Sequence, residues 1–475
     1  MVFSSLPFLF LFLPLCLGVY FLVPTAYKNA ALLFFSLLFY GIGEPICLLL
    51  MVLTVLADYA FGLQIGRHRN TPKKAKAYLI AAVIFNLFLL FFFKYLDLVF
   101  ELLSLLPPLS HLQPPGIPLP VGISFYTFQA LSYVIDVYRR EVNPQKNLVA
   151  FGTYVTLFPQ LIAGPILRYR EVDLQLTSRT HSVTQAADGT RRFLVGLAKK
   201  LLLANAAGEL WLLWRGDLQG GLNLCGAWLG LLSFSLQIYY DFSAYSDMAI
   251  GLGQLFGFSF SENFRYPYVS RSITEFWRRW HITLSTWFRE YLYFPLGGSR
   301  RGKWRTYGNL LAVWLFTGLW HGASLNFLIW GLYFFLLLCA EKSFPGKWMD
   351  RVPSPIRIAT TLILVMIGWL IFLCDGSENG LTPSQGITYL GALLGWGSTP
   401  LYDNNVSYHF LRNLPLLCLM ALGATPLPHL LHQRLKKRFP VAVEGACNLL
   451  CFPLFALCLA YLVNSGYNPF LYFRF

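Results

Sequence analysis

The chain has 475 residues, of which 56% are hydrophobic and only 12% are charged. A soluble protein carries about twice that share of charged residues, so the composition excludes a soluble enzyme. The net charge of +15 is typical of cytoplasmic loops rich in Lys and Arg rather than of nucleic-acid binding. We therefore expect an all-α, polytopic membrane protein that contacts membrane lipid and no nucleic acid.

Apolar runs near the length of a bilayer crossing follow one another along the whole chain, and no long hydrophilic stretch separates them. They predict one integral membrane domain, residues 1–475, with about 10–12 transmembrane helices and several re-entrant or partial ones. The candidate crossings are Leu6–Val23, Ala30–Leu56, Ala77–Leu103, Gly122–Val137, Leu148–Ile166, Phe193–Leu213, Gly226–Tyr240, Asp247–Phe258, Tyr307–Trp320, Leu325–Ala340, Ala359–Cys374, Leu411–Gly423 and Gly445–Val463.

Basic stretches between these runs predict which loops face the cytoplasm. They are Gly66–Lys76, Tyr138–Lys146, Arg301–Arg305, Glu341–Arg351 and His432–Arg438. Because the third and fourth stretches share one side, the chain between them must enter the membrane and return. Its turning point is "HGAS", so His321 should lie deep in the membrane. An ionisable group there indicates a functional site, the alternative being a packing histidine bonded to a backbone carbonyl.

A segment rich in basic and aromatic residues, Asn263–Arg305, precedes this turning point. Its middle part has helical periodicity and predicts a helix in the membrane interface, beginning with Ser272 and Glu275 as a capping box. We expect His281 to lie within this helix. The apolar face would comprise Ile273, Phe276, Trp277, Trp280, Leu284, Trp287 and Phe288.

Three arginines of this segment, Arg278, Arg279 and Arg289, project away from the apolar face. The segment is either a membrane anchor or a platform for an anionic donor, which would be a phosphorylated cofactor such as coenzyme A or an acidic carrier protein.

Two carboxylates, Asp241 and Asp247, lie inside an apolar run and need partners there. They would pair with arginines of the basic segment or line a polar tunnel. No metal site is expected, because the nine cysteines show no metal-binding spacing, and His429 and His432 flank a basic turn.

Three long stretches carry a family resemblance: "YDFSAYSDMAIGLGQLFGF", "NFRYPYVSRSITEFWRRWHITLSTWFREYLYFPLGGSR" and "FTGLWHGASLNFLIWGLYF". They resemble the membrane-bound O-acyltransferase (MBOAT) family. The opening "FSSLPFLFLFLPLCLGVYFLVP", the stretch "LPVGISFYTFQALSYVIDVYRRE" and the ending "NPFLYFRF" are similar to its bacterial alginate O-acetyltransferase-like branch. The resemblance implies a helical disc pierced by a central tunnel, in the bacterial cytoplasmic (inner) membrane.

The resemblance also assigns the chemistry. The family's invariant histidine falls on His321 and its second histidine on His281, and a neutral imidazole is a suitable general base for moving an acyl group from a thioester to a hydroxyl. Candidate hydrogen-bond donors to the tetrahedral intermediate are Trp320, Asn326 and nearby backbone N–H groups. No cofactor is expected to be bound, and the acyl donor would be acetyl-CoA or an acyl carrier.

The C-terminal tail "NSGYNPFLYFRF" should emerge on the external side after the last crossing. It is either a hydrophobic anchor in the interface or a carrier, in which Tyr472 accepts the acyl group near His321 and passes it to an external partner.

The predicted function is O-acetylation of an exported or cell-envelope polysaccharide, of alginate type or peptidoglycan, together with an extracytoplasmic acetyltransferase partner protein. The alternative is a transporter or flippase for a lipid-linked saccharide, which would predict paired repeats and many intramembrane charges. A non-enzymatic scaffold is a third interpretation, and it gives no reason for a deep histidine.

Overall fold

The computed structural model describes residues 1–215, 222–343, 351–377, 380–396 and 400–464, and in these ranges it contains helices and no strand. It divides into two compact units. Unit 1 comprises Met1–Leu197, Tyr245–Glu262 and Arg289–Tyr291, and unit 2 comprises Ala198–Ala244, Asn263–Phe288 and Leu292–Phe475.

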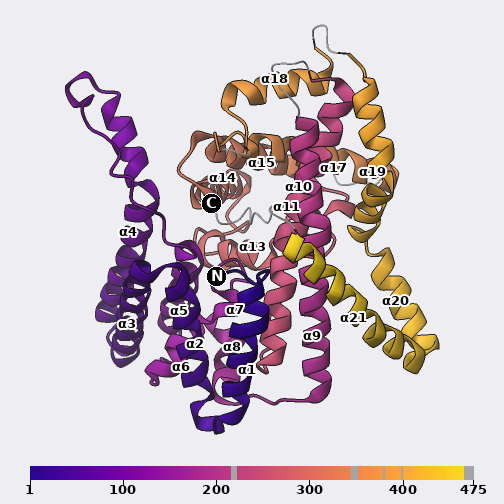
Figure 1. Ribbon diagram of the computed structural model, residues 1–475. Helices are drawn as coiled ribbons and strands as arrows, with labels where there is room; N and C mark the ends of the chain where they lie inside the picture. The colour runs from indigo at the N-terminus through magenta and orange to yellow at the C-terminus, as the bar shows by residue number, and fades with distance from the viewer. Residues whose placement is uncertain (216–221, 344–350, 378–379, 397–399, 465–475) are drawn as a thin grey trace. The chain divides into compact units, whose positions relative to one another are not determined.

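Unit 1 is a bundle in which α3 packs against α4 and α5, and α2 packs against α6 (Figure 1). The helices up to residue 198 are η1 (Phe8–Phe12), α1 (Leu13–Leu22), η2 (Thr25–Tyr27), α2 (Lys28–Gly43), α3 (Pro45–Arg67), α4 (Pro72–Ser104), η3 (Pro107–Leu109), α5 (Ile123–Arg139), α6 (Leu148–Thr156), α7 (Phe158–Leu161), α8 (Tyr169–Thr177) and α9 (Val183–Ala198).

Two runs of this unit that were each expected to form one crossing form two separate helices instead. The run Ala30–Leu56 forms α2 and α3, because Glu44 has φ −139° and ψ 66° and Pro45 begins the next helix. The run Leu148–Ile166 forms α6 and α7, which are separated at Leu157. A residue that precedes proline avoids the helical conformation, which explains the first break.

Asp247 is held inside unit 1 by Arg192. The Arg192 guanidinium lies 2.9 Å from Asp247 and 2.6 Å from Glu262. Asp247 therefore pairs with an arginine of α9, and the predicted pairing with the basic segment stays a prediction for this residue. An intramembrane carboxylate needs a partner, but the sequence does not show which of many arginines supplies it.

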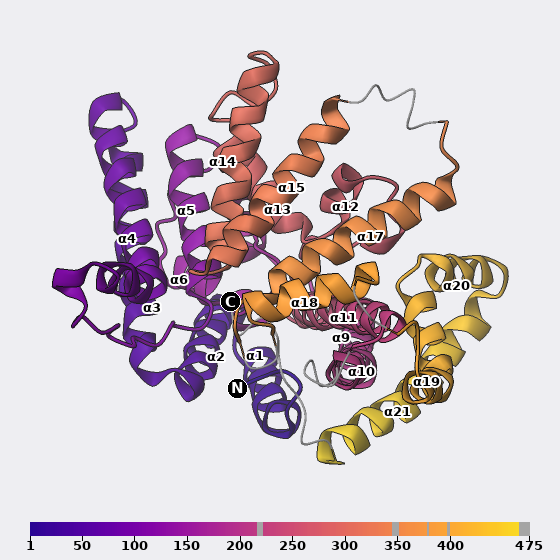
Figure 2. The same cartoon turned by 90° about the horizontal axis from the view of Figure 1, so that it is seen from above.

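In unit 2, α14 and α15 run side by side, and α15 packs against α17 (Figure 2). The helices after residue 198 are η4 (Lys199–Ala204), α10 (Asn205–Arg215), α11 (Leu224–Leu255), η5 (Pro267–Val269), α12 (Ile273–Arg279), α13 (Ile282–Phe288), η6 (Arg289–Tyr293), α14 (Lys303–His321), α15 (Leu325–Ser343), α17 (Ser354–Leu373), α18 (Pro383–Leu394), α19 (Asn404–Gly423), α20 (Leu427–Arg438) and α21 (Pro440–Asn464). The runs predicted as separate crossings at Gly226–Tyr240 and Asp247–Phe258 are parts of one helix, α11, whose residues from Tyr245 onward belong to unit 1.

Six helices of the described ranges are long and apolar enough to cross a membrane, or seven if the bent pair α19 and α20 forms one span. They are Thr25–Gly43, Pro45–Arg67, Pro72–Ser104, Leu325–Ser343, Ser354–Leu373 and Pro440–Asn464. By this criterion the count is lower than the expected number of about 10–12. Several predicted crossings are short or broken helices, such as α5 with 17 residues.

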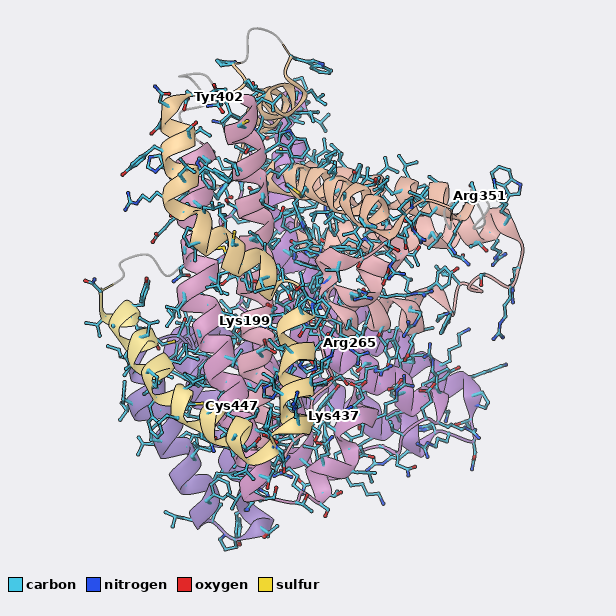
Figure 3. All side chains as sticks on the ribbon, turned by 90° about the vertical axis from the view of Figure 1, so that its right-hand side faces the viewer. Lys199, Arg265, Arg351, Tyr402, Lys437 and Cys447 are labelled. Atoms are coloured by element: carbon cyan, nitrogen blue, oxygen red, sulfur yellow. The ribbon has the colours of Figure 1, made fainter. Side chains whose placement is uncertain are left out.

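The C-terminal helices α20 and α21 form a hairpin, with Lys437 on the first helix and Cys447 on the second (Figure 3). The basic stretch His432–Arg438 is therefore helical, and Lys436 lies 3.0 Å from Glu444 across the hairpin. In the most apolar 18-residue stretch of α21, only 6% of the residues are buried within the protein. This helix corresponds to the predicted crossing Gly445–Val463.

Glycines allow α14 and α15 to pack backbone against backbone. A Cβ atom at Gly318 would overlap the carbonyl oxygen of Phe327, and one at Gly331 would overlap that of Trp314. Small residues permit this close approach between membrane helices. The two helices therefore form a closely packed hairpin, which confirms the predicted return of the chain after residue 321.

Replacing Gly318 by alanine should lower the free energy of unfolding by about 1–3 kcal/mol, because the new methyl group has no space beside Phe327. The midpoint of thermal unfolding in detergent measures the change. Gly308→Ala is the matched control on the same helix, because no atom lies within 4 Å of its Cβ position. That change should be neutral or stabilising by up to about 1 kcal/mol. Equal losses in both variants would contradict close packing at Gly318.

Candidate active site

His321 is the last residue of α14 and is 9% exposed. The helix ends there because Gly322 adopts an extended conformation. The imidazole packs edge-on against Trp330 at 5.0 Å and against Phe372 at 5.3 Å between ring centroids. Helices α14, α15 and α17 thus place the predicted catalytic histidine in an aromatic environment within unit 2.

His281 lies at a break between α12 and α13, not within one continuous helix as the periodicity predicts. Its φ of +43° is left-handed, a conformation that is uncommon for a residue other than glycine. The break arises because backbone groups of this segment form hydrogen bonds with Asn263 and Arg265 in place of those that a continuous helix would make. The backbone N–H of Ile282 donates to the carbonyl of Asn263, and that of Arg265 donates to the carbonyl of Arg279, each at 2.9 Å.

The side chain of His281 is 2% exposed and contacts polar and aromatic groups of unit 2. Its Nδ1 lies 3.0 Å from Oδ1 of Asn263. The ring of Phe242 packs edge-on against the imidazole at 4.7 Å. Burial lowers the pKa of His281 to about 3 because desolvation disfavours the charged imidazolium, so the ring is neutral at physiological pH.

Trp320 connects the two histidines. The centroid of its indole lies 6.2 Å from that of His281 and 4.9 Å from that of His321. The indole is 5% exposed. Both imidazoles therefore lie near the same buried aromatic side chain. The structure therefore brings together three of the residues that the sequence singles out.

Glu341 joins α15 to the start of α12. Its carboxylate accepts hydrogen bonds from the backbone N–H groups of Ile273 and Thr274, the second at 2.9 Å, and from the Thr274 hydroxyl at 2.8 Å. Ser272 also caps this helix, because its hydroxyl accepts from the N–H of Glu275 at 3.0 Å. The Ser272 half of the predicted capping box is confirmed, whereas the Glu275 carboxylate accepts from the backbone N–H of Arg271 at 2.8 Å and not from that of Ser272. Glu341 adds an anion at the positive end of the helix dipole.

Aromatic packing fixes α12 on the same hairpin. The indole of Trp277 lies 4.8 Å from that of Trp314 and 4.9 Å from the ring of Phe334. With Glu341, this packing ties the helix before His281 to the two helices that flank His321.

Asp241 is paired with Lys200, whose Nζ lies 2.6 Å from its carboxylate. The two side chains are 3% and 4% exposed. This partner of Asp241 is therefore a lysine of η4, before α11, and pairing with an arginine of the basic segment or lining a polar tunnel stays a prediction. Asp241 precedes Phe242, which packs on His281, so the ion pair adjoins the histidine site.

Asn326 uses its amide hydrogens within the protein. Its Nδ2 donates to the carbonyl of Phe372 at 3.0 Å, which joins α15 to α17. This bond uses one of the two amide hydrogens, and the same nitrogen lies 3.5 Å from the carbonyl oxygen of Ile371. Substrate binding by Asn326 stays a prediction, and the geometry favours a structural role.

The three arginines predicted to bind the donor fall in different units. Arg278 and Arg279 belong to unit 2, whereas Arg289 belongs to unit 1. Arg278 and Arg289 are exposed, and Arg279 pairs with Glu275 at 2.6 Å. Tyr472 lies outside the described residues.

Sequence reasoning missed Asn263, Lys200 and Glu341. Lys200 carried a signal, because a lysine inside an apolar run needs a counter-ion. No local sequence pattern indicated the roles of Asn263 and Glu341, since both lie far along the chain from the residues that they contact. Among the described residues, no group of three or more His, Cys, Asp or Glu side chains is arranged to hold a metal ion.

The family model of MBOAT, the membrane-bound O-acyltransferase family, matches residues 144–377. A probable alginate O-acetylase of Pseudomonas putida is 37% identical to this chain, and the alignment covers 100% of both proteins. The chain belongs to the membrane-bound O-acyltransferase family. This MBOAT protein is therefore an acyltransferase, and the predicted all-α, multi-pass membrane architecture is confirmed.

Two further relatives of this MBOAT protein differ in the acceptor that they are named for. A probable alginate O-acetylase of Pseudomonas aeruginosa is 44% identical over 80% of this chain and 73% of its own length. A peptidoglycan O-acetyltransferase of Helicobacter pylori is 32% identical over 83% of this chain and 81% of its own length.

Replacing Glu341 by glutamine should lower the free energy of unfolding by about 1.5–3 kcal/mol, because a charge-assisted cap is lost and an amide N–H₂ can face the N–H groups of α12. Thermal unfolding in detergent measures the loss. Asp188→Asn is the control, because Asp188 is 52% exposed in its pair with Arg191 and should change stability by no more than about 1 kcal/mol. A wild-type melting temperature for Glu341→Gln would show that the carboxylate does not hold α12.

Proposed function

We propose that this acyltransferase moves acetyl groups from a cytoplasmic donor across the membrane for O-acetylation of an exported or cell-envelope polysaccharide, of alginate type or peptidoglycan. The observation that carries the proposal is the placement of His281 and His321 on one buried indole, Trp320, in a member of the MBOAT family. The names of the full-length relatives support polysaccharide O-acetylation. No corresponding observation supports a transporter.

The buried histidines suit general-base catalysis. In the proposed reaction a histidine takes the proton of the acceptor hydroxyl while its oxygen attacks the carbonyl carbon of the thioester. The tetrahedral intermediate then collapses, the carbon–sulfur bond breaks, and the thiolate leaves with the proton. The family resemblance favours His321 as the principal base and His281 as its assistant, with Trp320 beside the reacting groups.

The proposed donor is acetyl-CoA or an acyl carrier on the cytoplasmic face. Arg278, Arg279 and Arg289 would contribute to its docking, since a guanidinium binds phosphate or carboxylate groups well. The exposure of Arg278 and Arg289 supports this assignment. The proposed partner is an extracytoplasmic acetyltransferase, and the proposed location is the bacterial cytoplasmic (inner) membrane.

His321→Ala should lower acyl transfer by at least about 10²–10⁴-fold, because the general base is lost, and His281→Ala should lower it less. Transfer of label from radiolabelled acetyl-CoA by the purified protein measures the effect. His429→Ala is the control, because His429 is exposed on α20 and bonds only locally to Gln433 in the contacts described. Wild-type transfer by His321→Ala would remove this residue from the mechanism.

Tyr472 is the proposed covalent carrier of the acetyl group. Its phenol oxygen would attack the thioester while a histidine takes the phenolic proton, and a polysaccharide hydroxyl would later receive the acetyl group and restore the phenol. Tyr472→Phe keeps the ring and removes only the hydroxyl. Acetylation of the exported polymer should therefore be lost in cells. Tyr467→Phe is the control within the same tail, and normal acetylation in Tyr472→Phe would leave the tail as a membrane anchor only.

A further inference from the structure

One oxygen atom, Oδ1 of Asn263, receives three hydrogen-bond contacts at the break that carries His281. The backbone N–H of Thr283 donates to it at 3.3 Å, and the Thr283 hydroxyl donates to it at 3.0 Å. Nδ1 of His281 lies 3.0 Å from the same atom. Because a backbone N–H can only donate, the atom that it faces must be the amide oxygen of Asn263 and not the amide nitrogen.

The amide oxygen of Asn263 determines which ring nitrogen of His281 carries the proton. An amide oxygen carries no hydrogen, so the contact at 3.0 Å is a hydrogen bond only if Nδ1 of His281 carries the proton. In the neutral ring one nitrogen is a donor and the other an acceptor. The lone pair of His281 is therefore on Nε2, the nitrogen that does not face Asn263.

Asn263 fixes the backbone of His281 as well as its side chain. The carbonyl of Asn263 accepts from the N–H of Ile282 at 2.9 Å, directly after the left-handed conformation of His281. Such a conformation persists where the surroundings determine it from several sides. Asn263 is 0% exposed, so water does not compete for these hydrogen bonds.

Aromatic rings limit how the imidazole can rotate. Phe242 packs edge-on at 4.7 Å, Phe264 is nearly parallel at 6.5 Å, and Trp320 lies at 6.2 Å. A flip of the ring would exchange Nδ1 for a carbon atom opposite Oδ1 and would break the hydrogen bond. The packing and the hydrogen bond therefore favour the same orientation.

We propose that Asn263 is a positioning residue that holds His281 as the Nδ1–H tautomer and thereby makes Nε2 the proton-accepting nitrogen when His281 assists His321 in acyl transfer. This inference rests on the proposed role of His281 in catalysis. When Nε2 accepts a proton in the course of the transfer, the ring becomes an imidazolium and its Nδ1–H becomes a stronger donor to Asn263. The proton then leaves Nε2 with the departing thiolate, and the ring returns to the same tautomer.

The experiment compares Asn263→Ala, which removes the acceptor, with Asn263→Asp, which keeps an oxygen in its place. Steady-state kinetics with radiolabelled acetyl-CoA should show kcat lowered by about 10–100-fold in Asn263→Ala, the range found for residues that orient a metal-ligating histidine through its other ring nitrogen. The donor KM should be nearly unchanged, and Asn263→Asp should recover much of the rate. Loss of donor binding with an unchanged kcat would contradict the proposal.

Nitrogen-15 NMR of histidine-labelled protein provides a readout that is independent of activity. The signals of His281, assigned by their absence from His281→Ala, should show a protonated Nδ1 and an unprotonated Nε2 in the wild-type protein. Asn263→Ala should shift this population toward the other tautomer. Thr283→Val is the control, because it removes one donor to Asn263 but leaves the contact between Asn263 and His281 intact, so the tautomer should be retained.

The two readouts separate this inference from the proposed function. Wild-type protein with its proton on Nε2 would overturn the assignment to Asn263, whatever the activity. If His281→Ala transfers acetyl at the wild-type rate, the catalytic role of His281 fails even when the tautomer is as expected. If Asn263→Ala does not fold, the wild-type spectrum and the kinetics of Asn263→Asp still decide the question.

Discussion

The hydrogen bonds between Asn263 and the segment around His281 are the constraint on which the candidate site depends. A continuous amphipathic helix from Ile273 to Phe288 would satisfy its own backbone and carry His281 on one of its faces. The bonds from Ile282 and Thr283 to Asn263 replace that arrangement. They end α12, begin α13 and direct the imidazole toward the buried indole of Trp320. Without these hydrogen bonds to Asn263, we expect the segment to form the continuous helix that its periodicity predicts.

The fold class could be predicted from the sequence because lipid imposes a simple rule. Every backbone polar group in the bilayer needs a partner within the protein, so long apolar runs form helices. Helix ends were harder to predict. The break at Glu44 has a local cause in Pro45, whereas the break at His281 is made by residues about 20 positions earlier in the chain. The single helix α11 was divided in the prediction because its polar residues interrupt the apolar run.

The candidate site was predictable only in part, for the same reason. The glycines and the histidine of the turning point after α14 are adjacent in sequence, and the α14–α15 hairpin confirms that turn. The partners of the buried charges are not adjacent. Lys200 reaches Asp241 from another helix, and Glu341 caps α12 from the end of α15. Charge at membrane depth indicates that a partner exists, but only tertiary packing shows which residue it is.

The left-handed backbone at His281 narrows the evolutionary choices at this position. Histidine, asparagine and aspartate enter that region several times more often than other side chains, and glycine enters it freely. A β-branched or bulky residue there would strain the turn between α12 and α13. A lineage that gave up the imidazole could therefore drift mainly among short polar residues and glycine. The shape of the backbone alone would thus keep this position to a short polar residue or glycine long after selection for a base had ended.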